Sequence, residues 1–153
     1  MNQLIEHITP NSTLFINGES YLVLAKARYE TEKGGDGYIK VFLSNDHALV
    51  YLLDGSEGTL LVKNYGAILP EFPTPKAFSF QEQDYVQVCH DTQILKEVFF
   101  GKEEDYEADL EIIDYEGKND DSLFISIGFI PETGERADLA GKCIDVKDIS
   151  IIN

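Results

Sequence analysis

Apolar and polar residues alternate along residues 20–65, the stretch around which the rest of the chain is organised. Side chains of a β-strand point to opposite faces in turn, so this alternation predicts strands with one face in a core. Residues 47–54 are apolar at both sets of positions, which is typical of a central strand. Glycine-rich turns at 33–37 and 54–58 separate the strands and predict an antiparallel meander. The alternating apolar positions are Tyr21, Val23, Ala25, Ala27 and Tyr29, followed by Ile39, Val41 and Leu43.

The N-terminal residues extend the same pattern backwards. Residues 1–9 suit a short helix or a loose strand that ends at Pro10, because the residue before a proline avoids helical geometry. A strand at 12–16 leads into Asn17-Gly18, a dipeptide typical of a tight hairpin turn with positive φ at both positions. These signals predict that the first half of the chain is a series of hairpins.

The second half of the chain is also predicted to be β-structure. Apolar runs predict strands at residues 84–89, 92–100, 110–115 and 122–130. The first two of these are expected to form a hairpin around His90-Asp91. Residues 142–152 are predicted to form a final strand, either continuous or broken near Asp148, and only residues 137–140 suggest a helical turn.

Three of the five prolines lie between the two halves, in residues 69–76. Proline cannot donate to a sheet ladder, so this segment is expected to be an extended crossover. Half of the chain alone is marginal for a core, so residues 1–153 are predicted to form a single domain, or two packed β subdomains at 12–68 and 77–153. The predicted fold is all-β, a mostly antiparallel meander with little helix that forms a partly open barrel or two packed sheets.

The charge of the chain restricts its partners. There are 28 acidic residues and 12 basic residues, which give a net charge of −16. Such a surface repels nucleic acid and anionic membranes, so we expect no direct nucleic-acid binding and no membrane association. The partners that this charge allows are a basic protein, cations or none in particular, since an acidic surface also keeps a protein soluble. Nothing at the N-terminus resembles a secretory signal and no apolar run is long enough to span a bilayer, so a cytoplasmic location is predicted. The oligomeric state is left open.

No motif in the sequence is specific for catalysis, for a cofactor or for a metal. The two cysteines, Cys89 and Cys143, make neither a disulfide framework nor a zinc site. Cys89 and His90 are adjacent on a predicted strand and point to opposite faces, so they do not form a catalytic pair. We expect Cys89 to be a structural residue at a strand end. No catalytic residue, no cofactor and no metal site is predicted.

Acidic residues are densest at residues 103–121. Their spacing does not fit a calcium loop, which places carboxylates at alternating positions before a glycine, and cation binding is left open. In one interpretation the acid covers the solvated face of an edge strand, where charge discourages aggregation. In the other it forms a docking surface for a basic partner. The residues predicted to bind that partner are Glu103, Glu104, Asp105, Tyr106, Glu107 and Asp109.

Part of the chain resembles a known family. The residues that carry the resemblance are Gly18 to Ala25, Tyr29, Tyr38 to Leu43, and Tyr51-Leu52-Leu53. They resemble domain-of-unknown-function family 4178, a bacterial β-rich group whose pattern has a glycine-tyrosine strand followed by W-x-E-Y-x-L. The resemblance covers about residues 12–65, with Tyr38 where the tryptophan of the family falls. It implies a small bacterial β module of unknown activity, with no catalytic residues to carry over.

Three functions follow from these observations. The first is a non-enzymatic protein-interaction module that presents an acidic, tyrosine-bearing β surface. The second is a nucleic-acid mimic that inhibits a DNA- or RNA-binding protein, which requires carboxylates spaced like phosphates on one face. The third is a small-ligand-binding barrel, or an enzyme, whose polar interior the sequence does not display. A deep pocket with convergent polar groups and perturbed pKa values would favour the third function.

Overall fold

The computed structural model describes residues 2–69 and 74–153, so part of the predicted proline crossover lies outside the described residues. The described chain forms an eleven-stranded sheet with one short α-helix and two 3-10 helices. The strands are β1 (Thr13–Ile16), β2 (Glu19–Thr31), β3 (Tyr38–Leu43), β4 (His47–Leu52), β5 (Thr59–Gly66), β6 (Ala77–Phe80), β7 (Gln83–Phe100), β8 (Leu110–Gly117), β9 (Leu123–Phe129), β10 (Asp138–Ile144) and β11 (Ile149–Ile152). The helical segments are α1 (Gln3–Glu6), η1 (Glu103–Asp105) and η2 (Val146–Asp148).

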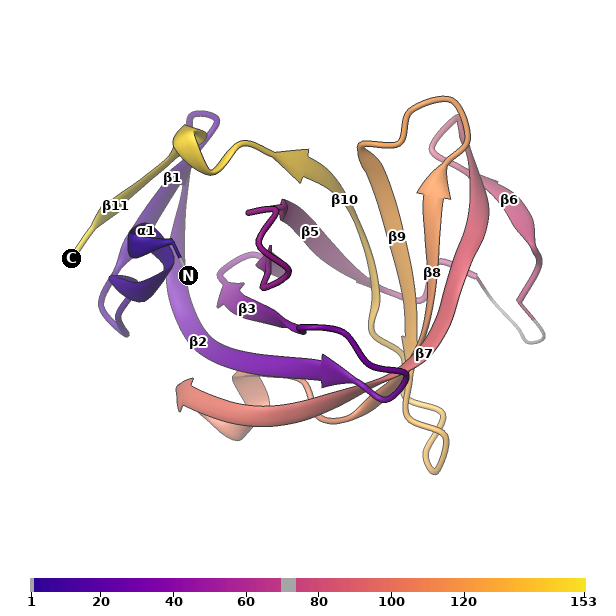
Figure 1. The fold of residues 1–153 in the computed structure, drawn as a ribbon, viewed down its shortest axis with the longest axis horizontal. Coiled ribbons are helices and arrows are strands. Elements are labelled where there is room, and N and C mark those ends of the chain that lie inside the picture. Colours follow the sequence, from indigo (N-terminus) through magenta and orange to yellow (C-terminus); the bar gives the residue numbers. More distant parts are fainter. Residues whose placement is uncertain (1, 70–73) are drawn as a thin grey trace.

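Eight of the strands close into an antiparallel barrel (Figure 1). The first half of the chain supplies β2, β3, β4 and β5 as one meander, and the second half supplies β7, β8, β9 and β10 as another. The two meanders pair along both edges, through β2 with β7 and through β5 with β10. The prediction of an all-β, mostly antiparallel fold is confirmed. The barrel is closed rather than partly open, because hydrogen bonds join both edges.

Alternation along each strand divides the apolar residues between the outside and the inside of the barrel. In β3, Ile39 and Val41 pack in a cluster outside the barrel wall, whereas Phe42 packs with the cluster inside it. Lys40, on the same face as Phe42, is also buried. β4 lies between β3 and β5 and buries residues 48–51 without interruption, which confirms the predicted central strand.

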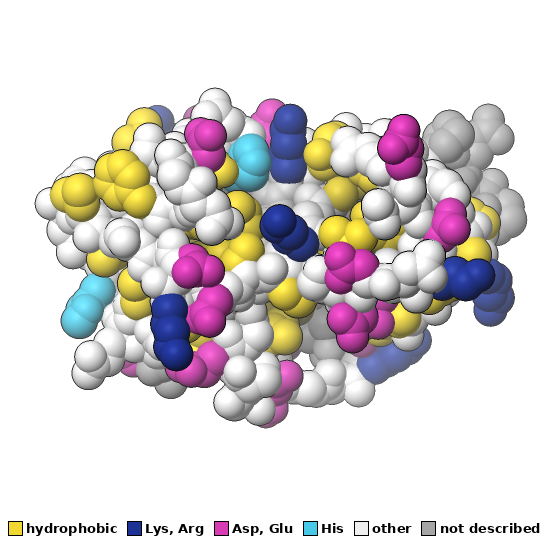
Figure 2. Space-filling view, turned by 90° about the horizontal axis from the view of Figure 1, so that it is seen from above, with side chains coloured by type: hydrophobic (Ala, Val, Ile, Leu, Met, Phe, Trp, Pro, Cys, Tyr) yellow, Lys and Arg dark blue, Asp and Glu magenta, His cyan; other side chains and the backbone are white. Residues whose placement is uncertain are grey.

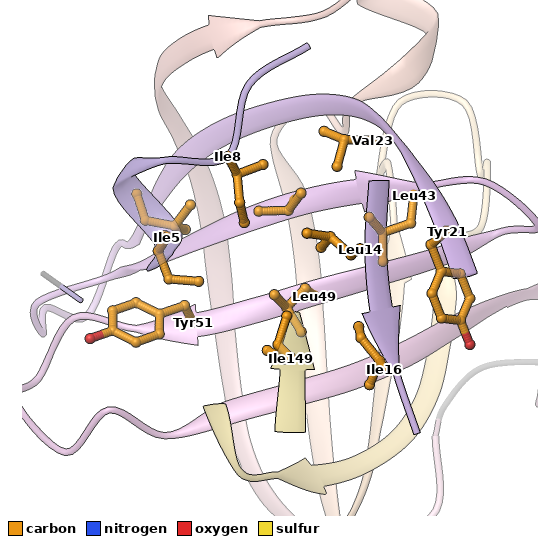
Figure 3. Close-up of a cluster of buried hydrophobic side chains, with 12 residues drawn as sticks. Ile5, Ile8, Leu14, Ile16, Tyr21, Val23, Leu43, Leu49, Tyr51 and Ile149 are labelled. Atoms are coloured by element: carbon orange, nitrogen blue, oxygen red, sulfur yellow. The ribbon is translucent and has the colours of Figure 1, made fainter. Parts of the chain in front are cut away.

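A flap made of α1, β1 and β11 covers one side of the barrel (Figure 3). The predicted Asn17-Gly18 turn is confirmed, since both residues have positive φ, and it folds β1 back onto the start of β2. The ammonium of Lys26 donates to the carbonyl of Ile5 at 2.7 Å and ties α1 to the wall. The buried residues under the flap are Ile5, Ile8, Leu14, Ile16, Tyr21, Val23, Ile39, Val41, Leu43, Leu49, Tyr51 and Ile149.

Two further clusters complete the apolar packing. One lies outside the barrel, where Tyr115, Ile125 and Ile127 are covered by Phe78 and Phe80 of β6. The other lies inside the barrel and consists of Ala48, Val50, Val62 and Leu139. Because most of the apolar residues pack outside the wall, the interior of the barrel is left with room for polar side chains.

The predicted hairpin around His90-Asp91 is wrong. Residues 83–100 form the single strand β7, which pairs with β6, β8 and β2 along its length. Asp91 is buried in the barrel and accepts a hydrogen bond from the backbone N–H of Lys33 at 3.1 Å. His90 lies instead within 3.1 Å of the Glu111 carboxylate. The polar pair occurs in mid-strand because each residue has a polar partner on its own side of the wall.

The final strand predicted at 142–152 is broken near Asp148, which was one of the two alternatives, and its two parts lie at different places in the sheet. β10 closes the barrel, β11 pairs with β1 in the flap, and η2 separates them. The carboxylate of Asp145 accepts from the N–H of Lys147 at 2.9 Å and caps η2, which interrupts the strand. Residues 137–140 form no helical turn, since β10 begins at Asp138.

The seam between β5 and β10 requires two special residues. A Cβ atom at Gly141 would lie 1.9 Å from the carbonyl oxygen of Leu61, so only glycine permits this close approach. The carboxylate of Asp138 is fully buried and accepts from Nη2 of Arg136 and from the N–H of Ile68, both at 2.6 Å. These contacts join the residues that follow β5 to the start of β10.

Candidate functional site

The barrel contains a cavity of about 440 Å³, which we call the lumen site. This volume lies within the roughly 300–1,000 Å³ that is usual for small-molecule sites. Its apolar lining includes Val50, Leu52, Leu60, Ile112, Leu123, Phe124 and Leu139. Its polar lining includes Tyr38, Lys40, Cys89, Asp91, Gln93, Asp114, Glu116, Asp121, Ser126 and Cys143. Apolar walls with a few convergent polar groups are the usual composition of a ligand pocket.

The lumen site opens at one end of the barrel. Exposed lining residues such as Gly34, Glu116 and Asp121 lie at the β2–β3 turn, at the end of β8 and at the β8–β9 turn, which meet at this end. The lining residues toward the opposite end, including Leu139, are buried. The acidic segment at 103–109, between β7 and β8, is bonded to barrel side chains at that opposite end and closes it.

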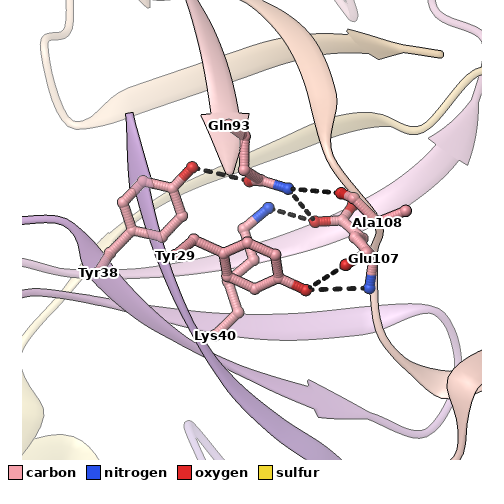
Figure 4. A network of polar contacts seen from close by, with 6 residues as sticks. All are labelled: Tyr29, Tyr38, Lys40, Gln93, Glu107 and Ala108. Carbon is pink, nitrogen blue, oxygen red and sulfur yellow. Dashed lines mark hydrogen bonds and ion pairs between the residues drawn. The ribbon is translucent and has the colours of Figure 1, made fainter. Parts of the chain in front are cut away.

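A network of polar contacts forms the floor of the lumen site (Figure 4). The hydroxyl of Tyr29 donates to the carbonyl oxygen of Glu107 at 2.6 Å and accepts from the Glu107 N–H at 3.1 Å. The hydroxyl of Tyr38 donates to Oε1 of Gln93 at 2.7 Å, and Nε2 of Gln93 lies 3.5 Å from both Oε1 of Glu107 and the carbonyl of Ala108. These bonds connect β2, β3 and β7 to the acidic segment.

Lys40 is the central cation of this floor. Its side chain is 6% exposed, its ammonium pairs with the carboxylate of Glu107, and it lies 5.5 Å and 5.6 Å from the ring centroids of Tyr29 and Tyr38. Burial raises the pKa of both tyrosine hydroxyls well above the usual range, so each stays a neutral hydrogen-bond donor. The charge of Lys40 is therefore neutralised from within the protein.

Asp114 lies on β8 and lines the lumen site with Ile112 and Glu116. Its Oδ1 atom is buried and has no hydrogen-bond partner among the described residues. Burial raises the pKa of this carboxyl to about 6, and the Asp91 carboxylate adds to the shift, whereas the Ser126 hydroxyl and the Lys40 ammonium oppose it. Asp91 differs from Asp114, because its own carboxylate is already bonded to backbone N–H groups. Asp114 thus lines the cavity with a carboxylate that has capacity for one more donor.

The structure distributes the predicted partner-binding residues unevenly. Glu107 turns into the barrel to meet Lys40, and its side chain is only 12% exposed. Asp109 accepts from the backbone N–H of Leu95 at 2.8 Å. Asp105 and Tyr106 are half-buried, whereas Glu103 and Glu104 are exposed on η1. The partner-binding role of these six residues stays a prediction.

The edge-strand interpretation of the acidic stretch is wrong. β8 is not an edge strand, because it pairs with β7 on one side and β9 on the other. Asp114 and Glu116 line the lumen, with Glu116 exposed at its open end. Figure 2 shows one face of the molecule, on which acidic side chains are spread among basic and apolar ones instead of gathering in one block.

The two cysteines both line the lumen site, which the sequence did not indicate. Cys89 is adjacent to Asp114 across the β7–β8 ladder and is exposed to solvent, and Cys143 is likewise exposed and reduced. Desolvation raises the pKa of both thiols, so they are weak nucleophiles at neutral pH. His90 lies across the wall beside Glu111 and does not pair with Cys89. The prediction that Cys89 and His90 are not a pair agrees with this arrangement.

Within residues 2–69 and 74–153, no three His, Cys, Asp or Glu side chains are grouped so as to hold a metal ion. No helix in the described part of the chain is long and apolar enough to cross a membrane. Comparison with family models, with curated proteins and with solved structures finds no match to this chain. The resemblance to domain-of-unknown-function family 4178 therefore stays a prediction.

Proposed function

We propose that this protein binds a small, partly apolar molecule in the lumen site. The observation that carries the proposal is Asp114, which lines a cavity of about 440 Å³ and whose buried Oδ1 atom has no partner among the residues described. An unsatisfied buried acceptor costs about 1–3 kcal/mol, and more when it is charged. A bound molecule that donates a hydrogen bond there would recover this cost.

The rest of the cavity supports a molecule with two unlike ends. Apolar side chains from β4, β5, β8, β9 and β10 form much of the wall, whereas the floor is polar. The floor groups are bonded to one another, so they are held in fixed positions before any ligand arrives. Such preorganisation lowers the entropic cost of binding.

The first function predicted from the sequence, an acidic interaction module, receives less support. It relied on a continuous acidic surface at residues 103–109, yet Glu107 is engaged with Lys40 inside the barrel. Asp109 is engaged with the backbone of Leu95. The segment has a structural role as the closed end of the barrel, so its acidity is explained without a basic partner.

A fluorescence titration with N-phenyl-1-naphthylamine tests the proposal. This neutral probe emits strongly only in apolar surroundings. At roughly 0.3 kcal/mol for each of about 17 non-hydrogen atoms, binding in the lumen corresponds to a Kd of about 0.2 mM. We expect a saturable rise in emission in this range.

Alkylation of the two lumen cysteines locates the probe. N-Ethylmaleimide attached to Cys89 and Cys143 at mildly alkaline pH fills part of the lumen, so the emission rise should be lost. The matched control is the Cys89→Ser, Cys143→Ser protein given the same treatment, which should bind as before. An absence of binding, or binding that alkylation of the wild-type protein leaves unchanged, would overturn the proposal.

A further inference from the structure

We infer that the molecule bound in the lumen site is an amphipathic organic cation whose protonated amine bonds to Asp114. This inference rests on the proposed function and adds the chemical class of the ligand. Three features support it: the distribution of charge around the cavity, the apolar residues of its walls, and the position of Asp114 in the lining.

The lumen site has more acidic than basic side chains. Among the described residues, four carboxylates line it, from Asp91, Asp114, Glu116 and Asp121, against one ammonium, from Lys40. That ammonium is already paired with Glu107 and lies against two tyrosine rings. The four carboxylates therefore outnumber the one cation of the lining, which acts on Asp114 from a distance but is paired with Glu107. An organic anion would meet uncompensated like charge here, whereas a cation would be attracted.

Asp114 is the carboxylate best placed to accept that cation. Asp91 already accepts two backbone N–H groups, and Glu116 and Asp121 are exposed at the open end, where water satisfies them. Asp114 alone combines a buried, unpartnered oxygen with a position between the open end and the polar floor. Acidic residues at the opening also attract cations and so raise their concentration near Asp114.

The walls favour an organic cation over a metal ion. Metal ions need several oxygen, nitrogen or sulfur ligands around one point, and no such group of three occurs among the described side chains. The cavity that Asp114 lines also has apolar lining residues, including Ile112, Phe124 and Leu139. A molecule with an apolar body and one ammonium group matches both features.

The charged and titratable groups that face Asp114 set the pH range of binding. Lys40 and Tyr38 face it from β3, and Asp91 and Cys89 face it from β7. Because burial places the pKa of Asp114 at about 6, the carboxylate is largely ionised at pH 7.5 and largely protonated at pH 5. Affinity for an amine should therefore fall about tenfold between these pH values, as the proton displaces the ligand.

Three indoles of similar size test the inference: tryptamine as the cation, tryptophol as the neutral alcohol and indole-3-propionate as the anion. The protein contains no tryptophan, so indole fluorescence reports each ligand directly. We expect tryptamine to bind about tenfold more tightly than tryptophol at pH 7.5, because charge-assisted hydrogen bonds are roughly twice as strong as neutral ones. Indole-3-propionate should bind most weakly.

Two variants separate the role of Asp114 from a general effect of charge. Asp114→Asn should bring the affinity for tryptamine down to that for tryptophol and abolish its pH dependence. Glu104→Gln, which removes an acidic charge from the closed end of the barrel, should leave the order of the three affinities unchanged. Thermal unfolding of each variant verifies that it is folded.

The outcomes are distinguishable. Equal or tighter binding of tryptophol by the wild-type protein would overturn the assignment of a cation and leave the proposed function standing. Retention of the preference for tryptamine in Asp114→Asn would also overturn it. If none of the three indoles binds, both the ligand class and the proposed function are contradicted.

Discussion

Replacing Asp114 with asparagine should stabilise the protein at neutral pH. The pKa of this carboxyl is about 6 in the folded protein and 3.8 in an unperturbed aspartate. The folded state therefore holds the proton more tightly than the unfolded chain, and ionisation costs the folded state free energy. This cost is absent below pH 3.8, grows as the pH rises toward 6, and is complete above it. Asparagine does not ionise, so the variant is free of the cost.

The expected gain follows from the two pKa values. Linkage gives about 3 kcal/mol at pH 7.5 and about half of that at pH 5. For a chain of 153 residues the larger value corresponds to a rise in Tm of roughly 6–12 °C. Removing an exposed charge by Glu104→Gln should change stability by no more than about 0.5 kcal/mol at either pH.

Urea unfolding followed by circular dichroism at pH 5 and pH 7.5 measures these differences for wild type, Asp114→Asn and Glu104→Gln. A variant at position 114 that is less stable than wild type at pH 7.5 would refute the reasoning. So would a gain of equal size at both pH values, because it would not come from ionisation. A more stable protein that has lost its affinity for tryptamine would identify Asp114 as a residue kept for function at the expense of stability.

Three other substitutions test the barrel itself. Asp138→Ala removes the buried carboxylate that pairs with Arg136 and should lower the free energy of unfolding in urea by about 3–5 kcal/mol. A loss below about 1 kcal/mol would contradict the role of Asp138 in holding the start of β10. Gly141→Ala forces a Cβ into the carbonyl of β5 and should lower Tm by more than about 4 °C, and an unchanged Tm would argue against the tight seam. Lys40→Met leaves Glu107 buried without its cation and should cost about 3 kcal/mol in urea unfolding. A loss below about 1 kcal/mol would count against the ion pair.

The strands could be predicted because their alternation is local. β3, β4 and β9 occur where the pattern placed them, since each contributes apolar residues to a core at every second position. The alternation could not predict whether the opposite face of each strand would be buried or exposed to water. The face of β3 that carries Lys40 would lie in water if the sheet were open, and it is buried because β2 pairs with β7. That pairing joins residues about seventy positions apart, and no local pattern specifies it.

The lumen site was missed for the same reason. Asp91 and Asp114 were interpreted as a turn residue and as edge-strand acid, because polar residues usually mark turns and solvated faces. Both are charged residues in the middle of strands that are paired on two sides. The available signal was the position of Lys40 between Ile39 and Val41, since a charge within an apolar run of a central strand needs a buried partner.

The position of a bound ligand is the most direct test of the central claim, and a two-dimensional ¹H–¹⁵N NMR titration with tryptamine at pH 7.5 measures it. We predict shifts concentrated at the backbone amides of lumen-lining residues, above all Asp91, Asp114 and Ser126, with no shifts for Glu104 or for the flap residues of β1 and β11. Shifts confined to the flap or to η1, or an unchanged spectrum at millimolar ligand, would contradict the account of the barrel as a binding site.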